Sequence, residues 1–331
     1  MHGPSPRMLD VWRPGVLAGP DVFAQIRRSR PAVLHVQVEF GIYGGAVGLA
    51  SLLSGLAASR ALFRQRMVVT LHQVPSVHDL TADSLRRLGV RLPVWMARAA
   101  LRAVVTVLSR LSDEMVVHAE IFRDRLRSEW GVSRPARVVP HGVTLDAQPA
   151  GSREPRLLLF GYLKWYKGIE VAVEAFRHLA DEFPEWTLTV AGASMSRSYL
   201  EMLHGLARPL GAHVQFLGGV EEPVADDLFR RAAIVLFPYR MLFSASGPLA
   251  RALGTATPCV ISDALRPLCP SWPHWAPLQP DAWVRILRPM MRDRQRRAAA
   301  ADLAAQHARA SAWPVAAART RAIYETVLSY E

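Results

Sequence analysis

The sequence has little cysteine, almost no lysine and no long apolar run. Two cysteines in 331 residues, with no CxxC pair and no Cys/His cluster, argue against a disulfide scaffold and against a zinc module. No window holds 18 uninterrupted apolar residues, and the opening MHGPSPRMLDVWRPG has neither an apolar core nor a small-residue cleavage site. We therefore expect no membrane span, no secretory signal and a reduced, cytoplasmic protein.

Composition and charge are those of a folded, basic protein. Half of the residues are hydrophobic and 21% are charged, which excludes a disordered or fibrous chain, and the length predicts about two domains. There are 40 Lys+Arg against 28 Asp+Glu, a formal net charge of +12, and in residues 1–150 alone 19 Arg face 11 acids. Such an excess indicates either a soluble arginine-rich protein or an anionic partner, namely phosphate groups or an anionic membrane surface. No nucleic-acid-binding motif accompanies it, so binding of DNA or RNA is not expected.

The second half of the chain alternates between apolar runs and amphipathic stretches. The runs predict strands at Leu157–Gly161, Thr187–Gly192, Val214–Gly218, Ile234–Pro238 and Cys259–Asp263. The stretches between them predict helices at Ile169–Phe183, Arg197–Leu210, Val224–Ala232 and Pro248–Gly254. This alternation predicts an α/β fold with a parallel, doubly wound sheet, which binds ligands at the carboxyl ends of its strands.

The first half repeats the pattern less regularly. Strands are expected at Ala32–Gln37, Met67–Leu71, Met115–Val117 and Arg137–Val139, and helices at Ala46–Leu56, Trp95–Ser109 and Ile121–Trp130. The segment Ala147–Pro155 is rich in Pro, Gly and Ser, as is typical of a linker. We therefore predict a shortened N-terminal Rossmann-like domain over residues 1–148, a C-terminal domain over 149–310, and a last helix over 311–331 that packs back toward the first domain.

Lysine usage gives the sharpest indication of a binding site. Thirty-eight of the 40 basic residues are Arg, and the two lysines, Lys164 and Lys167, lie three apart in the loop GYLKWYKG. That loop joins a predicted parallel strand to a predicted helix, whose N-terminus favours an anion. Because Lys presents a compact charge that suits phosphate, we expect both lysines to bind phosphate groups. The alternative is two lysines that fall by chance in an exposed turn.

A second loop of the C-terminal half has the residues of an anion cradle. Ser244-Ala245-Ser246-Gly247-Pro248 leads from the strand that ends at Pro238 into the next helix. Ser246 can cap that helix, and Gly247 allows a close backbone approach. An ordinary N-cap explains the same residues. Two such cradles on neighbouring strands indicate a diphosphate ligand.

Polar residues also mark strand ends in the first half. The loop Gly41-Ile42-Tyr43-Gly44-Gly45 follows the first predicted strand, with His35 and Glu39 nearby in sequence. His72 directly follows the second predicted strand, so we expect it to face a ligand, whereas His35 is better interpreted as a packed polar residue. No P-loop and no nucleophile elbow are present, so NTPase and hydrolase activities are not expected.

An ordered set of segments extends from about residue 30 to the C-terminus. The segments are LHVQVEFGIYGG and VVTLHQV in the first half, PHGV at 140–143, LLLFGYLKWYKGIEVAVEAF at 157–176, LTVAG at 188–192, VQFLGGV at 214–220, AAIVLFPY at 232–239, SGPLARALGTATPCVISD at 246–263 and RTRAIYETVLSYE at the end. Together they resemble the family 4 glycosyltransferases of GT-B fold. The resemblance implies two Rossmann-like domains that face a cleft. It also implies retaining transfer of a sugar from a nucleotide diphosphate sugar to an acceptor, with no obligatory metal and no further cofactor.

The resemblance also implies roles for individual residues. Lys167 matches the lysine that binds the donor diphosphate, and Ser246 and Gly247 match the loop whose amides meet the same phosphates. His72 falls near the active-site histidine at the sugar. The residues implied on the acceptor side or in the cleft are Glu39, Gly44, Gly45, His141 and Gly142.

The sequence departs from the family pattern at three positions. Phe243 and Arg251 stand where the family carries a pair of glutamates, and Tyr162 stands where an arginine usually follows the strand glycine, a charge that Lys164 can supply. The segment before the first strand is also short. These departures leave two alternatives beside a transferase: a non-catalytic relative that acts as a binding or partner protein, and an enzyme that modifies a nucleotide sugar without an acceptor. The acceptor itself is left open among polysaccharide, glycolipid and natural product.

One stretch of the first half combines arginines with apolar residues. Between residues 86 and 110 there is no acid, and the arginines are Arg86, Arg87, Arg91, Arg98, Arg102 and Arg110. On a helix, Arg91, Arg98 and Arg102 share one face, and Trp95 with aliphatic neighbours is expected to form another. This pattern predicts peripheral association with an anionic membrane, at its inner face. The alternative is a helix that covers the sheet and leaves its arginines in solvent.

Overall fold

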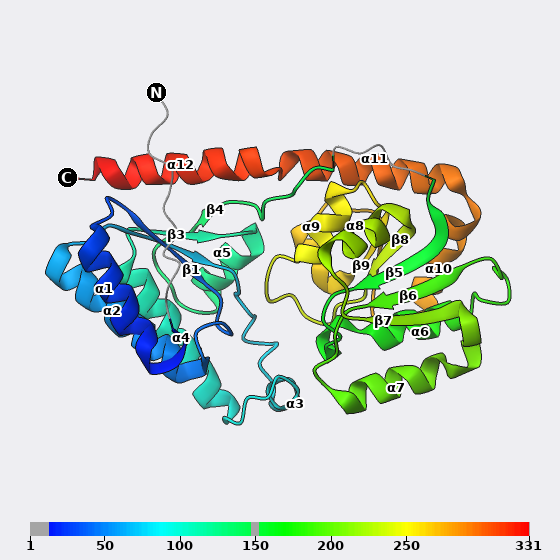
Figure 1. The fold of residues 1–331 in the computed structure, drawn as a ribbon, viewed down its shortest axis with the longest axis horizontal. Coiled ribbons are helices and arrows are strands. Elements are labelled where there is room, and N and C mark those ends of the chain that lie inside the picture. The colour runs from blue at the N-terminus through cyan, green and yellow to red at the C-terminus, as the bar shows by residue number, and fades with distance from the viewer. Residues whose placement is uncertain (1–12, 147–151, 331) are drawn as a thin grey trace. The chain divides into compact units, whose positions relative to one another are not determined.

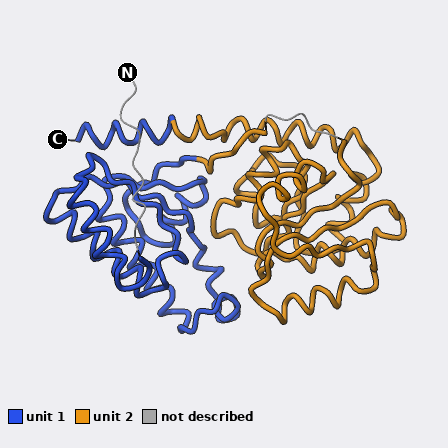
Figure 2. Tube along the Cα trace, in the orientation of Figure 1, with its two compact units in different colours: residues 1–139, 318–331 blue, residues 140–317 orange. Residues whose placement is uncertain are grey.

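Two compact units make up the computed structural model, which describes residues 13–146 and 152–330 (Figure 2). The first unit contains the residues up to Val139 together with those from Ala318 on, and the second contains Pro140–Ala317. The predicted domain boundary between residues 148 and 149 lies outside the described residues.

The first unit is built on a four-stranded parallel sheet in the order β1-β2-β3-β4 (Figure 1). Its strands are β1 (Leu34–Val38), β2 (Met67–Leu71), β3 (Glu114–Val117) and β4 (Arg137–Val138). Its helices are a 3-10 turn (Gly15–Leu17), α1 (Ala18–Ser29), α2 (Gly45–Phe63), α3 (Ala82–Arg87), α4 (Val94–Leu111) and α5 (Glu120–Ser128). All five residues of β2 are buried, as expected of an inner strand of a parallel sheet. The prediction of a parallel sheet in this half is confirmed, whereas helix α1 was not predicted.

Helices α1 and α2 approach each other through glycines. A Cβ atom at Gly19 would lie 2.0 Å from the carbonyl oxygen of Ser51, and one at Gly55 would lie 2.4 Å from that of Gly19. Helix α2 is eight residues longer than the predicted helix. Among the described residues it is also the one helix with the length and apolar composition that crossing a membrane requires, although a third of it is buried. No uninterrupted apolar run marks this helix in the sequence, because serines and Arg60 lie within it.

The last helix, α12 (Trp313–Ser329), ends against the sheet of the first unit. The guanidinium of Arg66 donates to the carbonyl oxygens of Val327 and Leu328 at 2.7 and 2.5 Å. The hydroxyl of Tyr330 donates to Glu114 Oε1 at 2.8 Å. Because Arg66 precedes β2 and Glu114 opens β3, the chain end is fastened to the amino ends of the two inner strands.

The second unit is built on a six-stranded parallel sheet in the order β10-β9-β8-β5-β6-β7. Its strands are β5 (Glu154–Phe160), β6 (Thr187–Ala191), β7 (Val214–Gly218), β8 (Ala232–Phe237), β9 (Cys259–Ser262) and β10 (Trp275–Ala276). Its α-helices are α6 (Ile169–Arg177), α7 (Arg197–Ala207), α8 (Glu222–Arg231), α9 (Gly247–Gly254), α10 (Pro280–Arg292) and α11 (Arg294–Ala310), with 3-10 turns at Trp165–Lys167, Arg208–His213 and Asp263–Leu268. The predicted strands all occur, with starts and ends that differ from the observed ones by no more than three residues.

The order of these strands decides which loops meet. Strand β5 is the first of the unit in sequence, yet it lies in the middle of the sheet between β8 and β6. Its apolar residues Leu157, Leu158 and Leu159 are buried and belong to the core between sheet and helices. The loops that follow β5 and β8 therefore emerge side by side at the carboxyl edge, where the sequence placed its two anion cradles.

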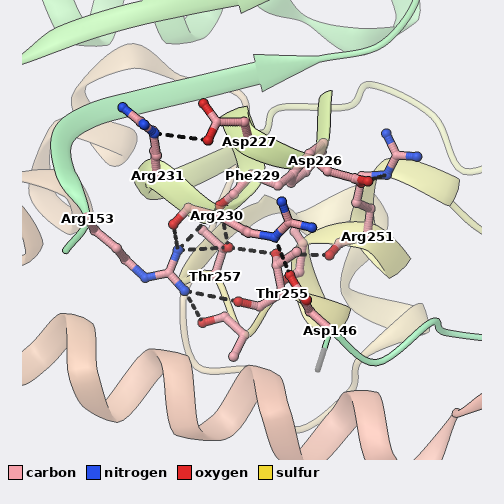
Figure 3. A network of polar contacts seen from close by, with 12 residues as sticks. Asp146, Arg153, Asp226, Asp227, Phe229, Arg230, Arg231, Arg251, Thr255 and Thr257 are labelled. Atoms are coloured by element: carbon pink, nitrogen blue, oxygen red, sulfur yellow. Dashed lines mark hydrogen bonds and ion pairs between the residues drawn. The ribbon is translucent and has the colours of Figure 1, made fainter. Parts of the chain in front are cut away.

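The start of β5 is held by one guanidinium (Figure 3). Arg153 precedes the strand, and its two terminal nitrogens donate hydrogen bonds of 2.9–3.3 Å. The acceptors are the carbonyl oxygens of Phe229, Arg230, Ala232, Thr255 and Ala256 and the hydroxyl of Thr257. These oxygens lie at the C-terminal ends of α8 and α9, where helical carbonyls lack intrahelical partners and favour a cation. Arg153 thus links the C-terminal ends of α8 and α9 to the start of β5.

Replacing Arg153 should destabilise the protein strongly. Arg153→Ala leaves buried carbonyls without donors, so we expect the free energy of unfolding to fall by about 3 kcal/mol. Arg153→Lys should recover only a minor part, since one ammonium cannot span both helix ends. Urea denaturation measures both. Arg177→Ala, which removes an exposed partner of Glu174, is the control and should cost under about 0.5 kcal/mol. Equal midpoints for the Arg153 and Arg177 variants would contradict this account.

Candidate functional site

The carboxyl end of β5 brings Gly161, Lys167 and the start of α9 to one point. Gly161 has a φ of +103°, and a Cβ atom there would lie 2.4 Å from Lys167 Nζ and 3.4 Å from Pro248 Cγ. Only glycine therefore fits between the lysine and the helix that begins at Gly247. The loop after β5 and the loop before α9, which the sequence marked separately, form one site.

Lys167 is the buried cation of this site. Its side chain is 8% exposed, and Nζ donates to the carbonyl oxygen of Phe160 at 3.3 Å. The small pocket around it is otherwise lined by apolar atoms and Tyr239, and Nζ lies 5.4 Å from the Tyr239 ring centroid. Burial, with a smaller contribution from Lys164, lowers the pKa of Lys167 from 10.5 to about 8. The pocket has a volume of about 10 Å³, the room of one water molecule, and an anionic oxygen placed there would supply the missing counter-charge.

The N-terminus of α9 lies next to this pocket, because its cap Ser246 contacts Tyr239, which lines the pocket. Ser246 caps the helix by accepting from Leu249 N at 3.3 Å, and its hydroxyl lies 3.4 Å from the hydroxyl of Tyr239. A Cβ atom at Gly247 would meet nothing within 4 Å, so the backbone is open to approach there. The first N–H groups of an α-helix lack intrahelical acceptors and carry partial positive charge, which adds to the charge of Lys167.

The remaining candidates of the C-terminal half lie differently. Lys164 is exposed, with Nζ 6.0 Å from the ring centroid of Tyr162, which is itself 61% exposed. Phe243 packs edge-on against Tyr166. Arg251 forms ion pairs with Glu222 and Asp226 of α8. The two positions at which the family carries glutamates therefore hold an aromatic contact and a structural ion pair.

In the first unit, His72 belongs to a chain of polar side chains at the ends of β1, β2 and β3. His72 Nε2 lies 2.8 Å from Gln37 Oε1, and His72 Nδ1 lies 3.2 Å from His118 Nε2. Beyond Gln37 the chain continues to His35, which contacts the hydroxyl of Tyr324 at 2.5 Å. Burial, with a contribution from His72, lowers the pKa of His35 to about 4, so His35 is neutral. His35 is thus the packed polar residue that the sequence indicated.

The partners of the His72–His118 pair limit which of its ring nitrogens can carry protons. His118 Nδ1 lies 3.0 Å from the carbonyl oxygen of Val139, which can only accept, and His72 Nε2 faces Gln37 Oε1, which also only accepts. The contact between the rings needs a third proton. Two neutral imidazoles supply only two N–H groups, so this arrangement suits a pair with one positive charge. A half-turn of the Gln37 amide would instead suit two neutral rings.

The glycine and acid candidates of the first unit have local explanations. Gly44, with a φ of +82°, caps α2, and a Cβ atom there would lie 2.6 Å from the backbone nitrogen of Gly15. Gly45 also has a positive φ, of +77°, and faces open space. Glu39 is exposed and accepts from Gln73 Nε2 at 3.3 Å. This hydrogen bond links Glu39 to Gln73, the residue that follows His72 in the sequence.

His141 and Gly142 lie at the start of the second unit. A Cβ atom at Gly142 would lie 2.2 Å from the ring of Trp313, so this glycine allows the first turn of α12 to approach. His141 Nδ1 lies 3.1 Å from the carbonyl oxygen of Gly142, and burial lowers the pKa of His141. The contacts of both residues are those of a packed crossover segment.

Sequence reasoning missed His118 and Tyr239. His118 directly follows strand β3, which is the same signal that identified His72. Tyr239 directly follows the run that ends at Pro238. Within the described ranges, no group of three His, Cys, Asp or Glu side chains is arranged to hold a metal ion.

Sequence comparison places the second unit in a known family. Residues 154–269 match the profile of the family described as glycosyl transferases group 1, a segment that contains the Lys167 pocket and α9. Glycogen synthase from two strains of Mycobacterium tuberculosis is 28% identical over 153 residues, which is 44% of this chain and 37% of that protein. The second unit therefore contains a segment that is similar to group 1 glycosyltransferases.

Solved structures extend the comparison to the whole chain. HepE from Anabaena, crystallised with UDP and glucose, superposes with a TM-score of 0.70 at 17% identity, covering 94% of this chain and 82% of that one. Sucrose-phosphate synthase from Thermosynechococcus elongatus superposes with a TM-score of 0.71 at 17% identity, covering 94% and 78%. The predicted family resemblance and the predicted GT-B fold are confirmed. The match to the curated relatives spans little more than a third of their length.

The burial of Lys167 predicts that the stability of the unliganded protein depends on pH. The pKa of Lys167 is about 8 in the folded state and 10.5 in the unfolded state, so between these values the folded state binds fewer protons. The cost of burying the ammonium is complete below pH 8 and disappears as the pH rises to 10.5. Relative to Lys167→Met, the wild type should therefore gain on the order of 3 kcal/mol of unfolding free energy across this window. Denaturation curves recorded in parallel for both proteins test this. A constant difference between them would show that Lys167 is not buried as a cation.

Proposed function

We propose that this protein is a retaining glycosyltransferase that moves a sugar from a nucleotide diphosphate sugar to a carbohydrate, lipid-linked or natural-product acceptor. The observation that carries the proposal is the buried Lys167 ammonium beside the N-terminus of α9, in a pocket without a carboxylate. Because HepE was crystallised with UDP and with UDP-glucose, UDP-glucose is the first donor to test.

The Lys167 pocket suits the chemistry at the leaving group. When the bond between sugar and diphosphate breaks, negative charge grows on the diphosphate and positive charge on the sugar. Lys167 and the first amides of α9 would stabilise the departing diphosphate, and the positive charge of Lys164 at the loop surface adds to this. The acceptor would attack the face that the diphosphate leaves, which retains the configuration.

His72 is the residue proposed to contact the sugar. The pair that it forms with His118 presents a ring nitrogen whose proton depends on the Gln37 amide. Such a ring can donate to a sugar hydroxyl or to the leaving group as charge develops. His118 then acts as a positioning residue, since it holds His72 and contacts Val139 rather than a ligand.

The second candidate function is a non-catalytic binding protein. It is favoured by Phe243 and Arg251, which occupy the positions of the family's glutamates and are engaged in packing and in an ion pair. Incubation of the purified chain with a panel of nucleotide diphosphate sugars and simple acceptors separates the candidates. Release of nucleotide diphosphate with a transferred sugar supports the transferase. Binding without turnover supports the alternative. An isomerised donor without acceptor would indicate an epimerase-like enzyme.

The two lysines offer a matched test of nucleotide binding. Lys167→Ala removes the buried charge, so we expect it to weaken nucleotide diphosphate binding by roughly 1.5–3 kcal/mol. Lys164→Ala removes an exposed charge, whose interaction with the ligand is worth no more than about 1 kcal/mol. Isothermal titration calorimetry measures both affinities. Equal losses for the two variants, or none for Lys167→Ala, would rule out the proposed diphosphate site.

The histidine pair makes a separate prediction about turnover. His72→Ala should lower kcat with little change in nucleotide diphosphate affinity, because Lys167 and His72 lie in different units. His118→Ala should lower kcat by about 10-fold, equal to ~1.4 kcal/mol, and shift a limb of the pH–rate profile. The exposed His178 serves as the control. A His118 variant with a lower melting temperature but an unchanged pH profile would leave His118 only a structural role.

A further inference from the structure

The first half of helix α4 does not cover the sheet of the first unit. Its buried residues are Val105 and Leu108, both in the second half of the helix. The segment that leads into the helix and its first turn expose large apolar side chains instead: Leu88 (39%), Leu92 (44%), Trp95 (70%) and Met96 (39%). Four such side chains within nine residues form a patch rather than scattered apolar contacts.

A groove of about 670 Å³ opens beside this patch. Trp130 forms its buried floor, with Nε1 donating to the carbonyl oxygen of Pro75 at 2.9 Å. Its walls are Val77, Val94, Trp95, Arg98, Ala99, Arg102 and Glu129. The volume lies in the range of pockets that hold small molecules or lipid chains. The sequence predicted that Trp95 and the arginines lie on different faces of the helix. This prediction is wrong, because Trp95, Arg98 and Arg102 line the same groove.

The groove is lined by two arginines and one glutamate, and the hydrogen bonds of both guanidiniums go to backbone carbonyls rather than to that carboxylate. The guanidinium of Arg98 donates to the carbonyl oxygens of Val77 and Leu80 at 2.8 and 3.2 Å, and that of Arg102 donates to the carbonyl oxygen of Glu129 at 3.2 Å. Neutral carbonyls position these cations without cancelling their charge. The carboxylate of Glu129 is itself engaged, accepting from Ser76 Oγ and Val77 N.

The surrounding sequence extends this charge. Residues 86–111 contain six arginines and no acid. Asp83 pairs with Arg86 and Arg87. Helix α4 contains no acidic residue that could pair with Arg91, Arg98 or Arg102. The patch is thus apolar at its centre and cationic around it, with a tryptophan at the boundary. This is the arrangement that favours the interface of an anionic bilayer.

We propose that this surface, consisting of Leu88, Leu92, Trp95, Met96 and the groove, docks on a membrane that contains anionic phospholipid. One acyl chain would occupy the groove, and the phosphates would contact Arg91, Arg98 and Arg102. A nucleic acid would match the charge but would leave the apolar centre unburied. The proposal uses the first unit alone and does not depend on the proposed transfer reaction.

Co-sedimentation with vesicles tests the proposal on the full chain. The vesicles are phosphatidylcholine alone and phosphatidylcholine mixed with phosphatidylglycerol. We expect binding only to the mixed vesicles, decreasing as salt is raised, because screening weakens the attraction. Equal recovery of the protein in the supernatant with both vesicle types at low salt would overturn the proposal.

Matched variants separate the docking surface from overall charge. Arg98→Gln/Arg102→Gln removes two charges and keeps a polar side chain at each position, and we expect the partition coefficient to fall on the order of 30-fold. Arg208→Gln/Arg285→Gln removes the same charge from exposed positions of the second unit and should change it little. An equal fall for both pairs would show that net charge, not this surface, holds the protein. If the groove pair does not fold, Arg91→Glu on the exposed helix approach replaces it.

A second pair tests the apolar part. Trp95→Ser/Met96→Ser should reduce binding at least about 10-fold, since two interfacial side chains are removed. Met195→Ser/Met202→Ser is the control, because these methionines are exposed to a similar degree (77% and 40%) in the second unit. Unchanged binding of the Trp95/Met96 variant would overturn the role of the groove. Lys167→Ala should bind vesicles as the wild type does, so a failure of the nucleotide site and a failure of the membrane site are distinguishable.

Discussion

The second unit depends on how strand β5 is fixed at its two ends. At the amino end, the Arg153 guanidinium collects carbonyls from the ends of α8 and α9. At the carboxyl end, Gly161 makes room for Lys167 against the start of α9. Residues that flank a single strand therefore bind the C-terminal end of helix α9 and pack against its N-terminal end. Any shift of β5 would open the lysine pocket and expose helical carbonyls together, so fold stability and the candidate site share one constraint.

The contrast between Arg153 and Lys167 explains why a chain so poor in lysine keeps one in this place. A guanidinium stays charged when buried and spreads its donors over several carbonyls, which suits a structural role. An ammonium is a point charge whose pKa falls when it is buried, here to about 8. It remains poorly compensated until an anion arrives. The pocket holds no carboxylate, and an anion bound there would supply the missing counter-charge, which is the basis of the proposed phosphate site.

The arginines of this protein have several distinct structural roles, and the net charge alone does not show which arginine has which role. Arg60 forms a bidentate pair with Asp113 at 2.7 Å, and Arg66 fastens the end of α12 to the first sheet. Arg98 and Arg102 bind neutral carbonyls and keep their charge available at a surface. The formal charge of +12 thus combines neutralised pairs, helix-end anchors and a cationic surface, and only the partners of each guanidinium distinguish them.

The sequence alone determined the parallel sheets, the polar residues at the ends of their strands and the isolation of Lys164 and Lys167, because these follow from periodicity and residue type. It could not show that Lys167 is buried while Lys164 is exposed, since three residues of a 3-10 turn decide which side chain points inward. Nor could it pair His72 with His118, 46 residues away, or place Trp95 beside Arg98 and Arg102 over Trp130. The full length of α2 was also not predicted, because this helix is apolar on all sides and packs closely on α1 through glycines rather than showing an amphipathic pattern. Strand order and helix packing join residues that are far apart in the chain, and that is why only the tertiary structure assembled the site.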